Sequence, residues 1–245
     1  MRRNSPERGA SSENDRSKPF FISPVHTDLL RRSWERLWQG LAARGDGGAL
    51  RDALLVRYGE PARHYHGAQH LWECLGHFAS ARSLAHEPAE LEAALWFHDA
   101  IYDPVRHDNE ERSAAWAGEA LRGAGVPLER IARIAGLILA TRHFDAGAVL
   151  SDIQPDVALL LDIDLAILGA QPARFAEYEG QIRREYAFVP DDVYNARRSA
   201  VLEHFAARDP LFRTVHFHNA LGARAYDNLR AAAGSGVALS APRSG

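Results

Sequence analysis

Apolar side chains recur at three- and four-residue intervals along most of this chain, and this spacing constrains its fold more than any other feature. The pattern i, i+3, i+4, i+7 is followed by Leu71, Cys74, Leu75 and Phe78. Residues 91–101 and 131–141 repeat it. Such spacing lines one face of an α-helix with apolar side chains, whereas a half-buried strand needs strict alternation. The chain is therefore predicted to form amphipathic helices.

Glycine and proline divide the helical segments. Breaks fall at residues 45–48, 88, 103–104, 123–127, 155, 169–172, 190 and 210. Proline bounds a helix because its ring removes a backbone donor and clashes with the preceding turn. The Leu- and Ala-rich run 157–169 favours a helix, and we also predict a helix for the weakly alternating segment 211–218. The expected fold is all-α, a single helical bundle domain of nine or ten helices over residues 21–233.

The two ends of the chain differ from this pattern. Residues 1–20 are polar and rich in Ser, Arg and Glu, so we predict a disordered N-terminal tail. Residues 234–245 are predicted to form a flexible C-terminal tail. The first residues lack the apolar core of a secretory signal, and no run of about 18 uninterrupted apolar residues exists to span a membrane. We expect a cytoplasmic protein without membrane association.

Charge and cysteine content narrow the function further. The net charge is −3, from 29 Lys and Arg against 32 Asp and Glu. A basic stripe is therefore not expected, and we expect no nucleic acid as partner. An anionic substrate would have to be attracted locally, by a metal ion or a few arginines. The chain has one cysteine, Cys74, which excludes an intramolecular disulfide and fits a reducing compartment.

Three segments contain side chains that bind metal ions. In RHYHGAQH (63–70), His66 and His70 are four residues apart, which places two imidazoles on one helical face. Gly67 lies between them and is a candidate for the start of the helix. His66 would then lie on the entering loop, near enough to serve the same site.

The second segment is WFHDAIYD (96–103). His98 continues the apolar stripe of Leu91, Leu95 and Ile101, so its side chain should point inward. Asp99 follows at once, and a carboxylate beside a buried stripe needs a partner. A divalent cation would satisfy both side chains.

The third segment is LLLDIDLAILG (159–169), in which Asp162 and Asp164 interrupt an otherwise apolar run. Buried carboxylates are costly unless they are paired, hydrogen-bonded or bound to a metal. Either one could instead form an ion pair with an arginine such as Arg183. Mixed histidine and carboxylate ligation suits Mn²⁺, Fe²⁺, Co²⁺, Ni²⁺ or Zn²⁺, with Mg²⁺ at a more oxygen-rich site. The sequence predicts a divalent metal ion as cofactor.

The order His…His-Asp…Asp on separate helices resembles the HD superfamily of metal-dependent phosphohydrolases. YHGAQH resembles the YHN-x-x-H element of the cyclic-nucleotide phosphodiesterases, in which the first histidine is a proton donor and the second a metal ligand. The segments RHYHGAQHLWECL, ALWFHDAIYD, LLDIDLAILG and EYEGQIRREYAFV resemble a bacterial family of HD-type phosphohydrolases, over residues 27–232.

The resemblance implies an HD-type helical bundle that hydrolyses a phosphate mono- or diester, such as a nucleotide or another small molecule. The metal ligands it implies are His70, His98, Asp99 and Asp164. It also makes His66 the catalytic acid. Asp99 would have a catalytic role, bridging the metals if there are two and orienting the water if there is one. Asp164 fits the last ligand better than Asp162, because aliphatic residues flank it. Asp162 stays an alternative.

Several other residues are candidates for the same site. His143 occupies the place of an additional histidine in HD proteins with two metals, but Phe144 follows it, so the His-His pair is absent. Glu110 and Glu111 could bind a second metal, orient a ligand, or cap the helix that Asp108 begins. Candidate phosphate-binding arginines are Arg63, Arg142, Arg197 and Arg198.

Two other functions fit the same motifs. A di-iron HD oxygenase would need more histidine ligands than His143 supplies. A nucleotide-binding sensor would keep the metal site but not turn over a substrate, and the presence of His66 argues against it.

Overall fold

A computed structural model describes residues 24–142 and 154–238, and every regular element in these ranges is helical. The α-helices are α1 (Pro24–Gly40), α2 (Gly48–Tyr58), α3 (Ala68–Ala81), α4 (Pro88–Phe97), α5 (Asn109–Gly123), α6 (Leu128–Ala140), α7 (Pro155–Asp164), α8 (Pro172–Glu185), α9 (Asp191–Ala206) and α10 (Val215–Ala238). Short 3-10 helices are η1 (Arg82–Leu84) and η3 (Leu165–Gly169). For the described ranges, the predicted all-α bundle of nine or ten helices is confirmed.

The predicted breaks agree with the helix boundaries, with local differences. Pro88, Pro155 and Pro172 each open a helix, where the missing N–H needs no partner. The run 157–169 is helical, but tightens to 3-10 geometry after Asp164. In segment 211–218, helix begins only at Val215, and the last helix continues beyond residue 233. The prediction for residues 1–20 lies outside the described residues.

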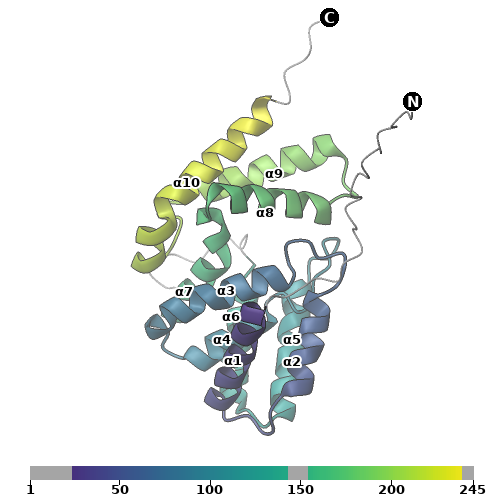
Figure 1. The fold of residues 1–245 in the computed structure, drawn as a ribbon, viewed down its shortest axis with the longest axis vertical. Helices are drawn as coiled ribbons and strands as arrows, with labels where there is room; N and C mark the ends of the chain where they lie inside the picture. The colour runs from purple at the N-terminus through teal and green to yellow at the C-terminus, as the bar shows by residue number, and fades with distance from the viewer. Residues whose placement is uncertain (1–23, 143–153, 239–245) are drawn as a thin grey trace, which may run out of the picture.

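Helix α4 lies at the centre of the N-terminal group of helices, packed against α1, α3 and α6 (Figure 1). All its residues from Ala89 to Phe97 are buried, as expected of a helix covered on every side. Two of them are glutamates with partners: Glu90 binds Arg130 and Arg133, and Glu92 accepts a hydrogen bond from Ser33. Among the described helices, none combines the length and the hydropathy that a membrane span requires.

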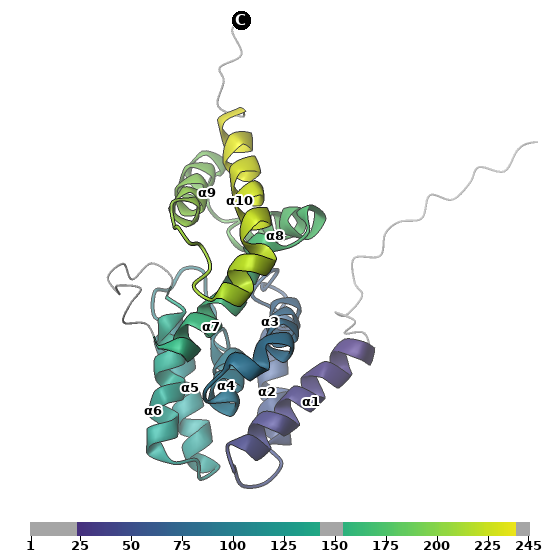
Figure 2. The ribbon, with the colours of Figure 1, turned by 90° about the vertical axis from the view of Figure 1, so that its left-hand side faces the viewer.

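Helices α8, α9 and α10 form a second group, and α7 with η3 lies between the two groups (Figure 2). Helix α10 packs closely on η3, since a Cβ at Gly169 would lie 2.6 Å from the Cβ of Leu221. Asp162 in α7 accepts hydrogen bonds from the N–H groups of Arg213 and Thr214, at 2.8 and 2.7 Å, which fixes the start of α10. The C-terminal end of α7 is thereby held against the start of α10, in the second group.

Candidate metal centre

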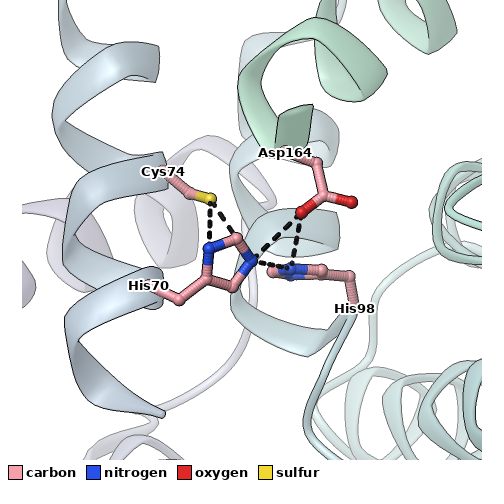
Figure 3. A group of neighbouring side chains, drawn as sticks. All are labelled: His70, Cys74, His98 and Asp164. Carbon is pink, nitrogen blue, oxygen red and sulfur yellow. Dashed lines mark hydrogen bonds and ion pairs between the residues drawn. The ribbon is translucent and has the colours of Figure 1, made fainter. Parts of the chain in front are cut away.

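Four metal-type side chains converge where α3, α4 and α7 meet. They are His70, Cys74, His98 and Asp164 (Figure 3). One donor atom from each lies within 4.8 Å of the others. His70 and Cys74 project from the same face of α3, His98 follows the last residue of α4, and Asp164 is the last residue of α7. These residues could hold a metal ion.

The spacing of the donor atoms fits a single ion. His70 Nε2 lies 3.0 Å from His98 Nε2 and 3.0 Å from Asp164 Oδ1, and His98 Nε2 lies 3.5 Å from Asp164 Oδ1. Ligands bound at ~2.1 Å are ~3.0 Å apart when adjacent in an octahedron and ~3.4 Å apart in a tetrahedron. The observed separations cover this range. The donor set, imidazole with carboxylate, is also one that divalent transition metals prefer.

His98 is oriented by the end of its own helix. The apolar stripe predicted a helix running through His98, but α4 ends at Phe97 and His98 is its C-cap. Its Nδ1 is 2.8 Å from the carbonyl oxygen of Leu95, one of the carbonyls that a helix end leaves without an N–H partner. In neutral His98, Nδ1 therefore holds the hydrogen, and Nε2 presents a lone pair to the cluster.

Asp99 lies at the edge of the same cluster. Its Oδ2 is 3.1 Å from His98 Nε2 and 3.5 Å from His70 Nε2. The turn that holds it is fixed by Arg63, whose guanidinium donates hydrogen bonds to the carbonyl oxygens of Asp99 and Ala100. Arg63 is buried and bound to backbone, so it does not fit the predicted role of a phosphate-binding arginine.

The structure places Asp164 in the cluster and Asp162 outside it. Both carboxylate oxygens of Asp162 are used by the backbone N–H groups of residues 213 and 214 and by the hydroxyl of Thr214. Arg183, the arginine considered as an ion-pair partner for this segment, binds Asp191 instead. All four side chains predicted as ligands thus lie together, although ligation itself stays a prediction.

His66 lies beside the cluster on the loop that enters α3. The helix begins at Ala68 with Gly67 as its N-cap, and a Cβ at Gly67 would lie 3.1 Å from the carbonyl oxygen of Tyr58. Glycine therefore permits the tight entry that brings His66 near. The His66 ring stacks on Tyr102 with centroids 4.1 Å apart, and lies 6.1 Å from the ring of His70.

Glu185 holds His66 in place. Its Oε2 lies 2.7 Å from His66 Nδ1 and accepts a hydrogen bond from the Tyr102 hydroxyl, while its Oε1 accepts the N–H groups of Tyr65 and His66. Burial is the largest single influence on the pKa of His66 and lowers it. The charge and hydrogen bond of Glu185, together with the charges of Asp99 and Asp164, outweigh burial and raise this pKa above the usual value. Burial, again the largest single influence, raises the pKa of Glu185. The charge of His66 and the hydrogen bonds from His66 and the Tyr65 backbone together outweigh it and lower this pKa to about 2. The pair therefore favours imidazolium with carboxylate.

The carboxylates of the cluster also raise the pKa of a neighbouring histidine. Burial lowers the pKa of His98, but the charges of Asp99 and Asp164 outweigh it and raise this pKa well above its usual range. Burial raises the pKa of Cys74 well above that of an exposed thiol. The two carboxylates thus attract positive charge to this point, whether a proton or a metal ion.

A cavity of about 700 Å³ opens beside the cluster. His66, Asp99 and Asp164 contribute to its lining. The aromatic and aliphatic side chains on the side of η3, α8 and α9 include Leu165, Leu168, Ile182, Tyr186, Tyr194 and Phe205. Basic side chains in the lining are Arg106, His107, Arg142, Arg197 and Arg198. The lining thus combines apolar side chains with basic and acidic ones, and it includes two carboxylates of the cluster.

The remaining candidates are placed as follows. His143 lies outside the described residues. Glu110 lines the cavity, and both Glu110 and Glu111 pair with Arg142. Asp108 makes no side-chain capping bond to α5 and pairs with Arg106 instead.

Two residues of the site were missed by sequence reasoning. Glu185 continues the buried stripe of Phe175, Tyr178 and Ile182 on α8, so a charged residue at a core position was the available signal. Cys74 was counted as an apolar member of its stripe, yet it lies four residues after His70, which puts both side chains on one helical face.

The chain matches no protein-family model, no curated protein and no solved structure. The resemblance to the HD superfamily therefore rests on the motifs alone.

Proposed function

We propose that the protein is a metal-dependent phosphohydrolase that cleaves a phosphate mono- or diester of a small molecule. The observation that carries this proposal is the shared cavity. Its lining includes two carboxylates of the candidate metal centre, Asp99 and Asp164, and the imidazole of His66. An ester bound there would contact the centre and a positioned acid together. The motif resemblance to the HD superfamily supports the same chemistry.

Each residue has a distinct part in this reaction. A divalent ion held by His70, His98, Asp99 and Asp164 would supply a Lewis acid that activates water and polarises a phosphoryl oxygen. Because Glu185 engages Nδ1 of His66, Nε2 is the ring nitrogen that gives its proton to the leaving oxygen. Such general-acid help is typically worth ~10²–10⁴-fold in rate. Asp99 also orients the attacking water.

The cavity walls define the substrate that fits. Arg198 is paired with Glu179, and Arg142 with Glu110 and Glu111, so these arginines carry compensated charge. Arg197 is exposed and lines the cavity, which makes it the better contact for an anionic oxygen. The apolar wall favours an ester whose organic group has an aromatic or aliphatic surface, since burying such a surface contributes ~25 cal/mol per Å².

A panel of phosphomonoesters and phosphodiesters, each assayed with Mn²⁺, Co²⁺, Ni²⁺, Mg²⁺ and Zn²⁺, tests the proposal. We expect turnover with at least one pair, and its loss in Asp99→Ala. The control Asp52→Ala removes an exposed carboxylate on α2 and should keep full activity. A metal-loaded protein that hydrolyses no ester would refute the proposal. Tight nucleotide binding without product would favour the sensor, and oxygen-dependent turnover with bound iron would favour the oxygenase.

A further inference from the structure

The thiol of Cys74 lies inside the candidate metal centre. Cys74 follows His70 by one helical turn on α3, so the two side chains leave the helix on one face (Figure 3). Its Sγ lies 3.6 Å from Nδ1 and 3.7 Å from Nε2 of His70. The side chain is buried, and its sulfur lies within 4.8 Å of the donor atoms of His98 and Asp164.

These separations place the sulfur within reach of the same ion. A metal bound to imidazole at ~2.1 Å and to a thiolate at ~2.3 Å holds the two atoms ~3.6 Å apart in a tetrahedron, or ~4.4 Å apart when they are opposite. Sγ lies almost equally far from Nδ1 and Nε2 of His70, at 3.6 and 3.7 Å, so it sits beside the ring and not along the Nε2 lone pair. Rotation about the Cα–Cβ bond of Cys74 is therefore needed to bring Sγ to an ion on Nε2, from its present place within 4.8 Å of the other donor atoms.

We propose that Cys74 binds the ion as a thiolate and makes this centre select a thiophilic ion, such as Zn²⁺, Co²⁺ or Fe²⁺, over Mg²⁺. Thiolate is a soft ligand that these transition metals accept, whereas Mg²⁺ takes oxygen ligands and keeps its water. As the bond from sulfur to metal forms, the thiol proton passes to solvent. The inference concerns the metal alone, so it does not depend on hydrolysis of any ester.

The single cysteine makes the test direct, because any thiolate signal must come from Cys74. We expect the full chain loaded with one Co²⁺ to show a thiolate-to-cobalt charge-transfer band in the near ultraviolet. Cys74→Ser should lose this band but keep the weaker visible bands of cobalt, because the histidine and aspartate ligands stay. The matched control is His77→Gln, which removes a metal-type side chain on the same helix that contacts Phe217 instead, and it should keep the band.

Competition between Zn²⁺ and Mg²⁺ gives a second readout. Replacing a residue that only hydrogen-bonds to a metal ligand lowers metal affinity by roughly 10–100-fold, and replacing a ligand itself should cost at least as much. Cys74→Ser should therefore lower the affinity for Zn²⁺ by at least roughly 100-fold. The affinity for Mg²⁺ should stay unchanged, because Mg²⁺ takes oxygen ligands. Cys74→Ala removes the donor without burying a hydroxyl, and serves if the serine variant does not fold.

A wild-type protein that binds one Co²⁺ without the charge-transfer band overturns the proposal. So does a wild-type protein that binds no Co²⁺, or an unchanged preference for Zn²⁺ over Mg²⁺ in both variants. A protein that shows the band but hydrolyses no ester supports Cys74 as a ligand and refutes only the proposed hydrolase.

Discussion

The replacement Glu185→Gln tests whether the carboxylate that holds His66 also sets its proton affinity. Glutamine keeps one oxygen to accept the N–H groups of Tyr65 and His66, at present 2.7 and 2.9 Å from Oε1. It puts an NH₂ group where Oε2 now lies 2.7 Å from His66 Nδ1 and 3.0 Å from the Tyr102 hydroxyl. The variant therefore loses the charge that stabilises imidazolium, while the backbone contacts stay.

The magnitude follows from the lost charge-assisted hydrogen bond. Such a bond is worth roughly 1.5–3 kcal/mol, and each ~1.4 kcal/mol changes the protonated fraction tenfold at a pH above the pKa. Since Glu185 raises the pKa of His66, the variant's pKa falls and the alkaline limb of the rate profile moves to lower pH. We expect a loss of roughly 10–100-fold near about pH 8.5 and little loss near about pH 6.

The assay is phosphate release from an alkyl phosphate, followed from about pH 6 to about pH 9, with metal content measured at each pH. The control Glu177→Gln makes the same change of charge on an exposed residue of α8 and should leave the profile unchanged. An alkaline limb at the same pH in Glu185→Gln and wild type would refute the reasoning. An equal loss at every pH, with metal retained, would show that Glu185 only positions the ring.

Further predictions concern the ligands, the acid and the metal count. His66→Ala should keep its metal and fold but lose roughly 10²-fold or more on an alkyl phosphate and much less on an aryl phosphate, whereas loss of metal would make it a ligand. Metal analysis should find no metal in Asp99→Ala and a normal metal content in Asp162→Ala. The free energy of unfolding of Asp162→Ala, measured with denaturant, should instead fall by on the order of 3 kcal/mol, because a buried carboxylate no longer binds the start of α10. The reverse metal contents would make Asp162 the ligand. We expect each chain to bind one metal ion tightly. If the wild type binds two metal ions and His143→Ala binds one, the protein has a second metal site that includes His143. In the folded protein the pKa of His66 is raised and that of Glu185 is lowered to about 2. Their ion pair therefore stabilises the metal-free protein fully between about pH 4.5 and about pH 6.5. This stabilisation is lost as the pH rises through the pKa of His66 and as the pH falls toward about 2. Urea unfolding of wild type and Glu185→Gln at several pH values measures this difference, and a gap that widens above about pH 8 would contradict it.

The sequence determined the helical architecture and most of the chemistry. Helical periodicity is a local property, because residues three and four apart share a face wherever the helix later packs. The proline and glycine breaks act within a turn or two, so the helix boundaries also followed from local chemistry. The end of α4 before His98 did not follow, since the apolar stripe continues past the point where the backbone turns.

Which side chains meet was decided by the tertiary structure. Asp162 and Asp164 are two positions apart on α7, roughly 200° around the helix, so only one can face the metal centre. The packing of η3 against α10 brings residues 213 and 214 to Asp162 and leaves Asp164 to the histidines. Sequence patterns carry no information on that packing.

The contact between His66 and Glu185 could also not be predicted from the sequence. The two residues are 119 positions apart, and α8 reaches the entry of α3 only because the second group of helices folds back over the first. In the sequence, Glu185 is one charge among several at the end of a helix, directly after Arg183 and Arg184. Its burial against His66 depends on packing angles between helices, which arise from the whole core and not from the local spacing of residues.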